Sequence, residues 1–378
     1  MNFLTLKPEA FGLDISDLSL KIIKLRKKGR RIRVVSFGEK EVKPGIIKEG
    51  EVIQKEELAE IIKQAMKEVK KEKLRTKYVV ASLPEERAFF QVIQMPKISK
   101  EDLRSAIIYE AENYIPLPIE KVYLDFQIIP QTDKNIDHLD ILICAIPRET
   151  VDPYFSSLKL AGLEPQSLEV ESLAITRALI KDGVTSSPVL IIDFGATRTS
   201  FIIFSGTSLR FTSSISVSSM NFTEIISKSL GIDLNKAEKL KIKYGLEKEL
   251  KSKSKKITKS TKERNKIFEA LVPALVDLTQ QIKKHLLYYQ THSFHEHLSL
   301  NGRKVSKILL CGGGSNLKGL KELLARELNL PVELGNPWIN ILSEKQKDTF
   351  GIPPEKSLGF TTALGLALRA IKENPFYD

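Results

Sequence analysis

The sequence has few cysteines and no long hydrophobic run. Its 378 residues include two cysteines, Cys144 and Cys311, and each stands in an apolar stretch typical of a strand. Two such thiols predict neither a disulfide framework nor a metal site, so we expect free, buried thiols in a reducing cytoplasm. The longest apolar runs, such as residues 141–146 and 189–192, are far shorter than the about 20 residues that span a bilayer. The amino terminus also lacks the charged start and apolar core of a signal peptide.

Positive charge is the marked bias of the composition. The formal net charge is +12 at pH 7, a value compatible with nucleic acid or anionic lipid as a partner. Much of the excess lies in residues 248–266, KELKSKSKKITKSTKERNK, which have few apolar side chains and no aromatic ring for stacking on bases. We therefore expect a solvated loop there and no nucleic-acid partner. A basic contact with a membrane surface or an acidic protein is the alternative.

Strand and helix patterns alternate and predict an α/β protein. The amino-terminal part is typical of three strands, a helix and a buried strand, at residues 11–15, 20–25, 31–37, 58–69 and 78–83. Residues 87–162 then change to β-α-β-β-α order, which is large enough for an inserted subdomain. Its first helix is predicted from an N-cap at Ser99 to Tyr114, because Pro116 ends it.

The second half of the chain repeats the opening pattern. Residues 12–23, GLDISDLSLKII, are similar to residues 191–202, IIDFGATRTSFI. In each, an apolar run contains an aspartate, Asp14 or Asp193, and a polar turn and a second apolar run follow. The repetition predicts two related halves, with a cleft that brings both turns to one ligand. The expected first domain consists of residues 1–86 and 163–187, with a returning helix at 345–378, and residues 87–162 form the inserted subdomain. A hinge is expected at 186–188. The expected second domain is residues 188–344, which contain a helical part near 222–300 and a Lys-rich loop at 247–266.

The two turns have the chemistry of a phosphate and metal site. Exposed N–H groups of a tight turn hold phosphate oxygens, and small residues let the backbone come close. Asp14 and Asp193 are expected to hold Mg²⁺ and its waters, because a carboxylate and a phosphate are both anionic. Lys21 places a point charge against a phosphate.

Two further segments fit the rest of a nucleotide. Residues 312–315, GGGS, follow an apolar strand and precede an amphipathic helix, and they offer a flat surface for an adenosine. Tight strand–helix packing is the alternative reason for these glycines. Glu238 and Lys241 are three residues apart on a predicted helix and share one face. The carboxylate suits a ribose hydroxyl and the lysine stem suits a base, with a surface ion pair as the alternative.

These motifs resemble the actin-like superfamily, and within it the PilM family of type IV pilus assembly proteins. The likeness extends over nearly the whole chain and includes residues 89–95, ENYIP at 112–116, AEKLK at 237–241, YYQ at 288–290 and ALGLALR at 363–369. The resemblance implies an α/β, actin-like (ribonuclease H-like) duplicated two-domain fold with a β-α-β-β-α inserted subdomain of the SHS2 type. The related cell-division protein FtsA, which forms filaments at the membrane, is the main alternative, and a sugar kinase is the third.

The resemblance also implies a site for ATP and Mg²⁺. Residues 14–21 correspond to the first phosphate loop, 193–195 to the second and 312–315 to the adenosine loop, while Glu171 matches a position that orders the attacking water. The implied catalytic residues are Asp14, Glu171 and Asp193, the two aspartates also hold the metal, and the nucleotide-binding residues are Ser16, Ser19, Lys21, Gly195, Thr197, Glu238, Lys241, Gly312, Gly313, Gly314 and Ser315.

Two departures from the family pattern bear on catalysis. Ser16 stands where the family usually has glycine, and Ser218 and Ser219 stand near a usual glycine pair. A side chain at Ser16 crowds the phosphate or replaces a water contact. Because the first turn keeps Asp14 and Lys21, we expect nucleotide binding with at most slow Mg-dependent ATP hydrolysis.

The resemblance implies a protein partner as well. PilM proteins bind the N-terminal cytoplasmic tail of PilN, an inner-membrane protein, in a groove between the inserted subdomain and the first domain. The chain is then expected in the cytoplasm, reaching the inner-membrane alignment complex of the pilus, or of a related secretion system, only through this partner. Residues 89–93 and 103–114 are candidates for the groove, although their apolar side chains fit a core better. The chain stops soon after its last apolar helix, without the membrane-binding helix of FtsA, and this favours PilM.

Overall fold

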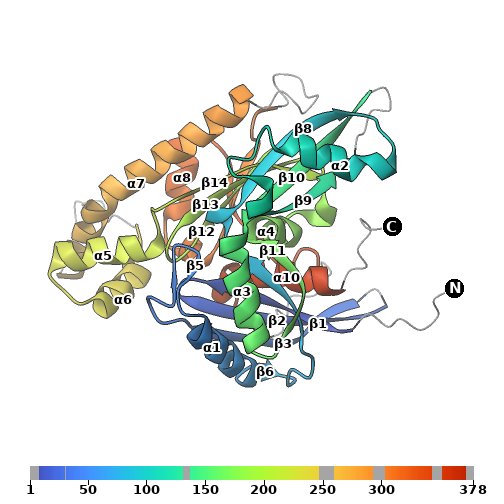
Figure 1. Cartoon of the computed structure of the whole chain (residues 1–378). Helices are drawn as coiled ribbons and strands as arrows, with labels where there is room; N and C mark the ends of the chain where they lie inside the picture. Colours follow the sequence, from blue (N-terminus) through green and yellow to red (C-terminus); the bar gives the residue numbers. More distant parts are fainter. Residues whose placement is uncertain are drawn as a thin grey trace. The chain divides into compact units, whose positions relative to one another are not determined.

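The computed structural model describes residues 8–29, 31–130, 137–246, 259–292, 303–342 and 351–371 (Figure 1). The chain divides into two compact units. The first unit contains Met1–Ser186, Phe204–Thr212 and Asn336–Asp378, and the second contains Ser187–Ile203 and Ser213–Gly335. The first long segment thus ends at Ser186, within the stretch expected to be a hinge. The finer division into domains remains a prediction.

A six-stranded mixed sheet forms the centre of the first unit. Its order is β11-β7-β1-β2-β3-β6, with β1, β2 and β3 antiparallel and with β7 and β11 parallel to β1. The strands are β1 (Ala10–Ser16), β2 (Ser19–Lys28), β3 (Arg31–Glu41), β6 (Lys70–Lys71), β7 (Tyr78–Leu83) and β11 (Glu164–Val170), and a short ribbon of β4 (Ile47–Lys48) and β5 (Glu51–Val52) follows β3. The predicted strands of this part are confirmed.

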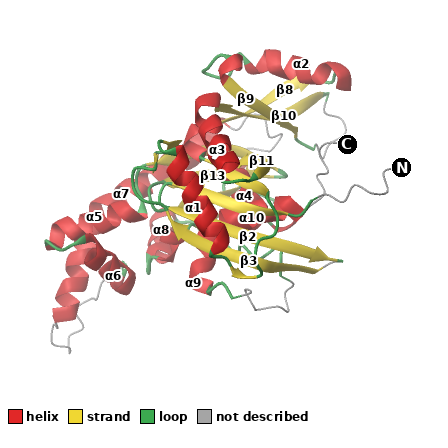
Figure 2. Cartoon of the chain, turned by 60° about the horizontal axis from the view of Figure 1, so that its bottom comes forward, coloured by secondary structure: helices red, strands yellow, loops and turns green. Residues whose placement is uncertain are grey.

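Helices cover both faces of this sheet. On one face lie α1 (Lys55–Lys67) and α3 (Arg148–Leu160), side by side in Figure 2, and on the other lie α4 (Glu171–Leu179) and α10 (Thr361–Ile371). The alternation of β1 explains the two layers, because Phe11 and Leu13 join the α1 and α3 core whereas Ala10 joins the α4 and α10 core. The result is a three-layer α/β/α arrangement.

A three-stranded antiparallel sheet in the order β8-β10-β9 forms the predicted insertion. Its elements are β8 (Phe89–Pro96), α2 (Lys100–Ala111), β9 (Val122–Ile128) and β10 (His138–Pro147). Ser99 caps α2 by accepting a hydrogen bond from the amide of Asp102, as predicted. Ile93, Leu103 and Ile107 are buried in the core of this sheet, whereas Tyr109 and Tyr114 are exposed. The core interpretation of these segments is therefore confirmed only for the buried side chains.

Two details of the insertion differ from the sequence-based expectation. The helix α2 ends at Ala111 rather than at Tyr114, because residues 112–114 already form a turn before Pro116. The helix α3, expected to close the inserted subdomain, packs Tyr154 and Leu158 into the core of the six-stranded sheet. An amphipathic pattern predicts a helix and its buried face, but it does not select between two sheets.

A five-stranded sheet in the order β14-β13-β12-β15-β16 belongs mainly to the second unit, although residues 204–212, at the end of β13 and in β14, are grouped with the first. These strands are β12 (Val189–Phe194), β13 (Thr199–Ser205), β14 (Ser208–Ile215), β15 (Lys307–Cys311) and β16 (Val332–Leu334). The strands β12, β15 and β16 run parallel. The order repeats β3-β2-β1-β7-β11 of the first unit, which confirms the duplicated fold predicted from the echo of the two aspartate turns. Cys144 and Cys311 lie on β10 and β15 as free thiols; Cys311 is buried and Cys144 half-buried.

Helices α5 (Ser219–Leu230), α6 (Leu234–Tyr244), α7 (Lys259–His292) and α8 (Leu320–Leu328) complete the second unit, and α9 (Pro354–Ser357) precedes α10 in the first. The prediction of a Lys-rich loop up to residue 266 is wrong from Lys259 onward, because α7 begins there. The reason is visible in the buried face of α7, since Ile267, Leu271 and Leu275 recur every four residues and the charged run extends this helix. Residues 247–258 lie outside the described part of the chain.

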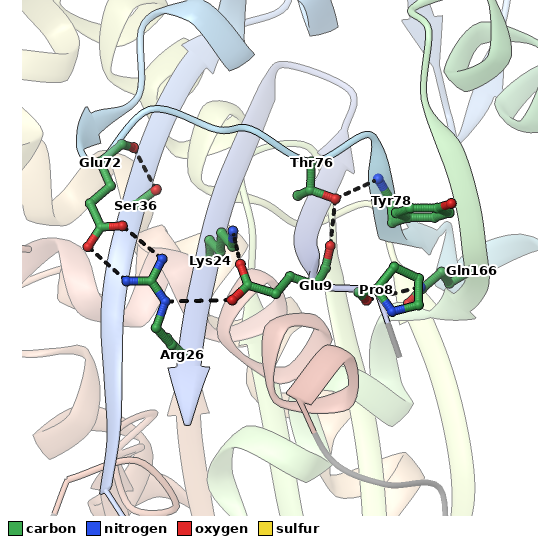
Figure 3. A network of polar contacts seen from close by, with 9 residues as sticks. All are labelled: Pro8, Glu9, Lys24, Arg26, Ser36, Glu72, Thr76, Tyr78 and Gln166. Atoms are coloured by element: carbon green, nitrogen blue, oxygen red, sulfur yellow. Dashed lines mark hydrogen bonds and ion pairs between the residues drawn. The ribbon is translucent and has the colours of Figure 1, made fainter. Parts of the chain in front are cut away.

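A polar network anchors the entry of the chain into β1 (Figure 3). The carboxylate of Glu9 accepts a hydrogen bond from buried Lys24 and lies 3.7 Å from Arg26. Arg26 in turn makes two hydrogen bonds to Glu72, at 3.0 and 2.9 Å. Thr76 donates to the carbonyl of Glu9. The hydrogen bond from Lys24 lowers the pKa of Glu9, so charged pairs help to hold this end of the sheet.

Candidate functional site

The first predicted turn is a two-residue hairpin loop between β1 and β2. Ser16 and Ser19 are paired across it, with Asp17 and Leu18 between them. The Ser16 hydroxyl donates to the Ser19 carbonyl at 3.1 Å and lies 3.3 Å from the Ser19 hydroxyl. Lys21 Nζ donates to the same Ser19 hydroxyl at 2.7 Å. Three predicted binding residues therefore form one polar cluster, and the side chain of Ser16 is used inside the turn.

Asp14 lies beside this cluster, because it is paired with Lys21 across the hairpin. Lys21 Nζ is 3.8 Å from Asp14 Oδ2, and the carboxylate is almost completely buried. The hydroxyl of Ser82, on β7, donates to Asp14 Oδ1 at 3.4 Å and accepts from the Ile15 amide at 2.7 Å. Burial raises the pKa of Asp14, with the charge of Lys21 and the Ser82 hydrogen bond acting against it. A bound cation would further stabilise the ionised form.

The second predicted turn joins β12 to β13. The Gly195 amide donates to the carbonyl of Arg198 at 3.0 Å, which closes the turn around half-buried Thr197. Two amides at the start of α5 then bond to this turn, from Ser219 to the Gly195 carbonyl at 3.1 Å and from Met220 to the Ala196 carbonyl at 2.9 Å. The amino end of α5 is thereby fixed to the turn that follows Asp193.

The glycine turn after β15 packs directly on the Asp193 turn. Gly312 has φ +81°, and a Cβ built there would lie 2.2 Å from Asp193 Oδ1. A Cβ on Gly314 would lie 2.7 Å from the ring and carbonyl of Phe194. Gly313 is exposed and a Cβ there meets nothing within 4 Å. Close packing therefore explains Gly312 and Gly314, whereas Gly313 faces open space that a ligand can occupy.

Two side chains under the glycine turn are also held in place. The buried Ser315 hydroxyl donates to the Cys311 carbonyl, so it secures the end of β15. Burial raises the pKa of the Cys311 thiol well above its usual range, and the neighbouring Asp193 adds to the effect. Cys311 is thus an inert core thiol at neutral pH.

Glu238 and Lys241 do not form a surface ion pair, because Lys241 is 4% exposed. Its Nζ lies 2.8 Å from the Ser219 carbonyl, 2.7 Å from the Thr223 hydroxyl and 2.7 Å from Glu238 Oε2. Thr223 donates to the same carboxylate oxygen. Burial lowers the pKa of Lys241, with Glu238 acting against it. Lys241 therefore acts as an internal tie between α5 and α6, and the Glu238 side chain, 42% exposed, is the partner that a ligand can reach.

The predicted site residues thus fall into two sets. Asp14, Ser16, Ser19 and Lys21 form one cluster in the first unit, and Asp193, Gly195, the 312–315 turn, Glu238 and Lys241 are connected in the second. Glu171 is the first residue of α4. The prediction that both sets serve one ligand is not tested by these contacts.

Three polar residues that hold these clusters were missed from the sequence. Ser82 interrupts the apolar run YVVASL, which was a usable signal for a buried polar role. Ser219 and Thr223 lie one turn apart on α5 and contact Lys241. Because Lys241 is on another helix, residue spacing within one segment does not predict these contacts.

The described residues contain no group of three or more His, Cys, Asp or Glu side chains that could hold a metal ion. The aspartate turns suit Mg²⁺, which is commonly held by one or two carboxylates together with phosphate oxygens and waters.

Comparison with known proteins decides the family. The sequence profile of the family described as "Type IV pilus assembly protein PilM" matches residues 12–371. The chain belongs to the PilM family of type IV pilus assembly proteins. It is similar to a solved "PilM-PilN type IV pilus biogenesis complex", with 28% identity and a TM-score of 0.78 over 97% of this chain and 100% of that one.

More distant relatives share the fold. MreB 5 of Spiroplasma citri, solved with bound AMPPNP, is 15% identical, with a TM-score of 0.50 over 88% of this chain and 93% of that one. FtsA of Helicobacter pylori is 27% identical over 47% of this chain and 37% of its own length, and FtsA of Enterococcus hirae is 24% identical over 62% and 57%. The chain thus spans about a third to three fifths of these FtsA relatives. The fold is actin-like, as predicted from the paired turns.

Proposed function

We propose that the chain is an actin-like ATP-binding scaffold of type IV pilus assembly that docks the N-terminal cytoplasmic tail of a PilN-like inner-membrane protein. The observation that carries the partner is the full-length likeness, at 28% identity, to a solved PilM–PilN complex. The partner places the protein in the cytoplasm, at the inner face of the membrane and within the inner-membrane alignment complex. None of the helices in the described residues is both long and apolar enough to cross a membrane.

Nucleotide binding is proposed from the two turn clusters and from an actin-like relative that was solved with AMPPNP. In the first unit, Lys21 and the Ser19 hydroxyl offer donors to phosphate oxygens. In the second, Gly313 exposes backbone, and Glu238 is available to a ribose hydroxyl. Asp14 and Asp193 are the proposed carboxylates for Mg²⁺, which would neutralise phosphate charge when bound.

The hydroxyl of Ser16 bears on the rate of hydrolysis. It is turned toward Ser19 within the hairpin rather than left without a partner. The serine is therefore accommodated by the turn, and we propose that binding persists. The same hydroxyl adds bulk where the family usually has glycine, so we propose that hydrolysis is slow, with Glu171 in the water-ordering position.

The first expected result concerns the partner. A synthetic peptide with the sequence of the N-terminal cytoplasmic tail of a PilN-like protein from the same organism is expected to bind the full chain with a one-to-one stoichiometry in titration calorimetry. A scrambled peptide of the same composition is the control, because it keeps the charge and loses the sequence. Heats equal to dilution for both peptides, with and without Mg-ATP, would contradict the docking proposal.

The second expected result concerns the nucleotide. Lys21→Met keeps the length of the side chain and removes the charge that faces Ser19. Because a charge-assisted hydrogen bond contributes about 1.5–3 kcal/mol, the dissociation constant for Mg-ATP is expected to rise by about 10- to 100-fold. A fluorescent ATP analogue titrated into the full chain measures this change.

Lys27→Met is the matched control for that experiment. Lys27 lies on the same strand, exposed at its far end, and its replacement is expected to leave nucleotide affinity unchanged. Thermal unfolding of both variants separates a folding defect from lost binding. Wild-type affinity in a folded Lys21→Met variant would refute the assignment of the first turn to phosphate.

A further inference from the structure

The turn between β4 and β5, formed by Glu49 and Gly50, has an uncommon backbone conformation. We call these two residues the Gly50 turn. Both have left-handed backbone angles, with φ +50° at Glu49 and +74° at Gly50. A non-glycine residue at positive φ is uncommon and persists where its surroundings fix it. The contacts of the Gly50 turn show what fixes it.

The Gly50 turn bonds to the first phosphate-type turn. The Gly50 amide donates to Asp17 Oδ1 at 3.1 Å, and this hydrogen bond is buried. Asp17 is one of the two loop residues between Ser16 and Ser19. The other loop residue, Leu18, accepts at its carbonyl from the amide of Val42 at 3.0 Å, in the segment that leads to β4. The loop that presents Ser16 and Ser19 is therefore held from outside by this segment.

The same turn also bonds to both chain connections of the inserted sheet. Arg87, two residues before β8, donates from Nε to the Glu49 carbonyl at 3.2 Å and pairs with Glu51 at 2.8 Å. Tyr154, on the helix that directly follows β10, donates from its hydroxyl to the Gly50 carbonyl at 3.1 Å. Tyr154 is 1% exposed. Glu49 and Gly50 thus contact the segment that enters the insertion and the helix that follows it.

No space is left for adjustment at this point. A Cβ on Gly50 would lie 2.1 Å from Glu86 Oε1 and 2.7 Å from the side chain of Pro84. Both belong to the segment that enters the insertion. The Glu86 carboxylate is the end of a flexible side chain, so a displacement of that segment reaches Gly50 mainly through the rigid Pro84 ring.

A second link runs from the same segment to α4. Glu85 is 3% exposed and accepts a hydrogen bond from the Ser172 amide at 3.1 Å. Burial raises the pKa of Glu85, with hydrogen bonds from Ser172 and Thr212 acting against it. Ser172 adjoins Glu171, the residue in the water-ordering position. The entrance to the insertion therefore contacts α4 directly and reaches the Ser16–Ser19 loop through the Gly50 turn.

We propose that the Gly50 turn couples the Ser16–Ser19 loop to the inserted subdomain, with Asp17 and Tyr154 as positioning residues. A shift of the insertion is transmitted through Gly50 to Asp17 and changes the geometry of the loop. This link is a property of the fold of the first unit. Its consequence for ligands rests on the proposed function: a tail peptide on the insertion and Mg-ATP at the loop then change each other's affinity by the same factor.

Hydrogen exchange measured by mass spectrometry tests the link without any ligand. Tyr154→Phe removes the hydroxyl and keeps the ring, so the core stays filled. We expect amide exchange in peptides covering residues 14–21 to become about three- to tenfold faster, because Gly50 no longer holds Asp17 in place. Tyr123→Phe is the matched control, since it removes the hydroxyl that donates to Asp152 on the surface of the same unit and leaves the Gly50 turn untouched.

Arg87→Met is the second variant, and it guards against a folding defect because Arg87 is partly exposed, with 32% of its side chain accessible. It is expected to speed exchange in the same peptides, while peptides from β3 keep wild-type rates. Unchanged exchange over residues 14–21 in both variants would overturn the proposal. Faster exchange throughout the first unit in both would equally overturn it, because the effect would then be general destabilisation.

Ligand titrations separate this inference from the proposed function. In the wild type, Mg-ATP and the tail peptide are expected to shift each other's dissociation constant by one common factor, and in Tyr154→Phe that factor falls toward 1. Failure of either ligand to bind the wild type contradicts the proposed function and leaves the exchange result standing. Independent binding of the two ligands in the wild type contradicts the coupling.

Discussion

Replacement of Glu169 by alanine is expected to lower the free energy of unfolding by about 3–5 kcal/mol, because it removes one partner of a buried ionic cluster. Glu169 lies on β11 with its side chain fully buried. Arg177 of α4 donates to both carboxylate oxygens, and Arg369 of α10 lies 3.2 Å from Oε2. Without the carboxylate, two guanidinium groups at the junction of α4, α10 and the sheet lose their counter-charge. Urea unfolding at pH 7 measures the loss.

The same carboxylate predicts a pH dependence. Burial raises the pKa of Glu169, but the charges and hydrogen bonds of Arg177 and Arg369 outweigh burial, so the pKa lies below its usual value. A carboxyl with a lowered folded-state pKa binds fewer protons in the folded state than in the unfolded state, so stability rises with pH across that window. Its contribution is complete above about pH 5 and is lost as the pH falls through the folded-state pKa. The difference between wild type and Glu169→Ala should therefore shrink in acid.

Glu164→Ala is the control for this prediction. Glu164 lies on the same strand and pairs with Lys159 on the surface. Exposed pairs contribute little to stability, so the control variant should unfold close to the wild-type midpoint. Equal destabilisation by the two alanine variants would contradict the role assigned to the buried cluster.

Replacement of Gly365 by alanine is expected to destabilise the first unit, although alanine is normally the better helix former by about 1 kcal/mol. A Cβ on Gly365 would lie 1.9 Å from the carbonyl oxygen of Ala174, where α10 packs on α4. The obstacle is backbone, so one helix must move. Overpacking of this kind costs about 1–3 kcal/mol and sometimes more, and we expect about 3 kcal/mol here because both helices are buried between sheet and neighbours.

Gly313→Ala is the matched change for Gly365→Ala. It adds the same methyl group where nothing lies within 4 Å and where φ is not in the left-handed region. Thermal and urea unfolding should give a wild-type midpoint for Gly313→Ala and a clearly lower one for Gly365→Ala. A Gly365→Ala variant as stable as wild type would show that α4 and α10 can separate without loss.

The duplicated fold and the two aspartate turns could be predicted from local sequence. Apolar runs interrupted at Asp14 and Asp193 gave strands, turns and the repeat, because strand and hairpin signals act over a few residues. The pairing of Asp14 with Lys21 follows from the same hairpin, since a two-residue loop fixes the register. Such contacts join residues that are close in the chain, so a sequence pattern within one segment predicts them.

The remaining contacts join segments that are distant in the chain, so no local sequence pattern predicts them. Ser82 reaches Asp14 across 68 positions, and Tyr154 reaches Gly50 across 104. The sheet on which α3 packs could not be predicted for the same reason, because the apolar face of α3 suits two sheets equally. The loop predicted for the Lys-rich run was wrong for a different reason. Its charge density favoured a loop, whereas the periodic apolar face of α7 extends the helix back to Lys259.

The helix α10 has a consequence for biosynthesis. Leu364, Leu366 and Ala367, near the carboxyl end of the chain, are completely buried, and Leu366 packs with Ala10 and Val80 at the start of β1 and β7. The segments β1 and α4 are synthesised before the second unit and α10 after it, so part of one face of the first sheet stays uncovered while the residues of the second unit emerge. The nascent amino-terminal part therefore cannot complete its core until α10 has been made, and its apolar face depends on protection during that time.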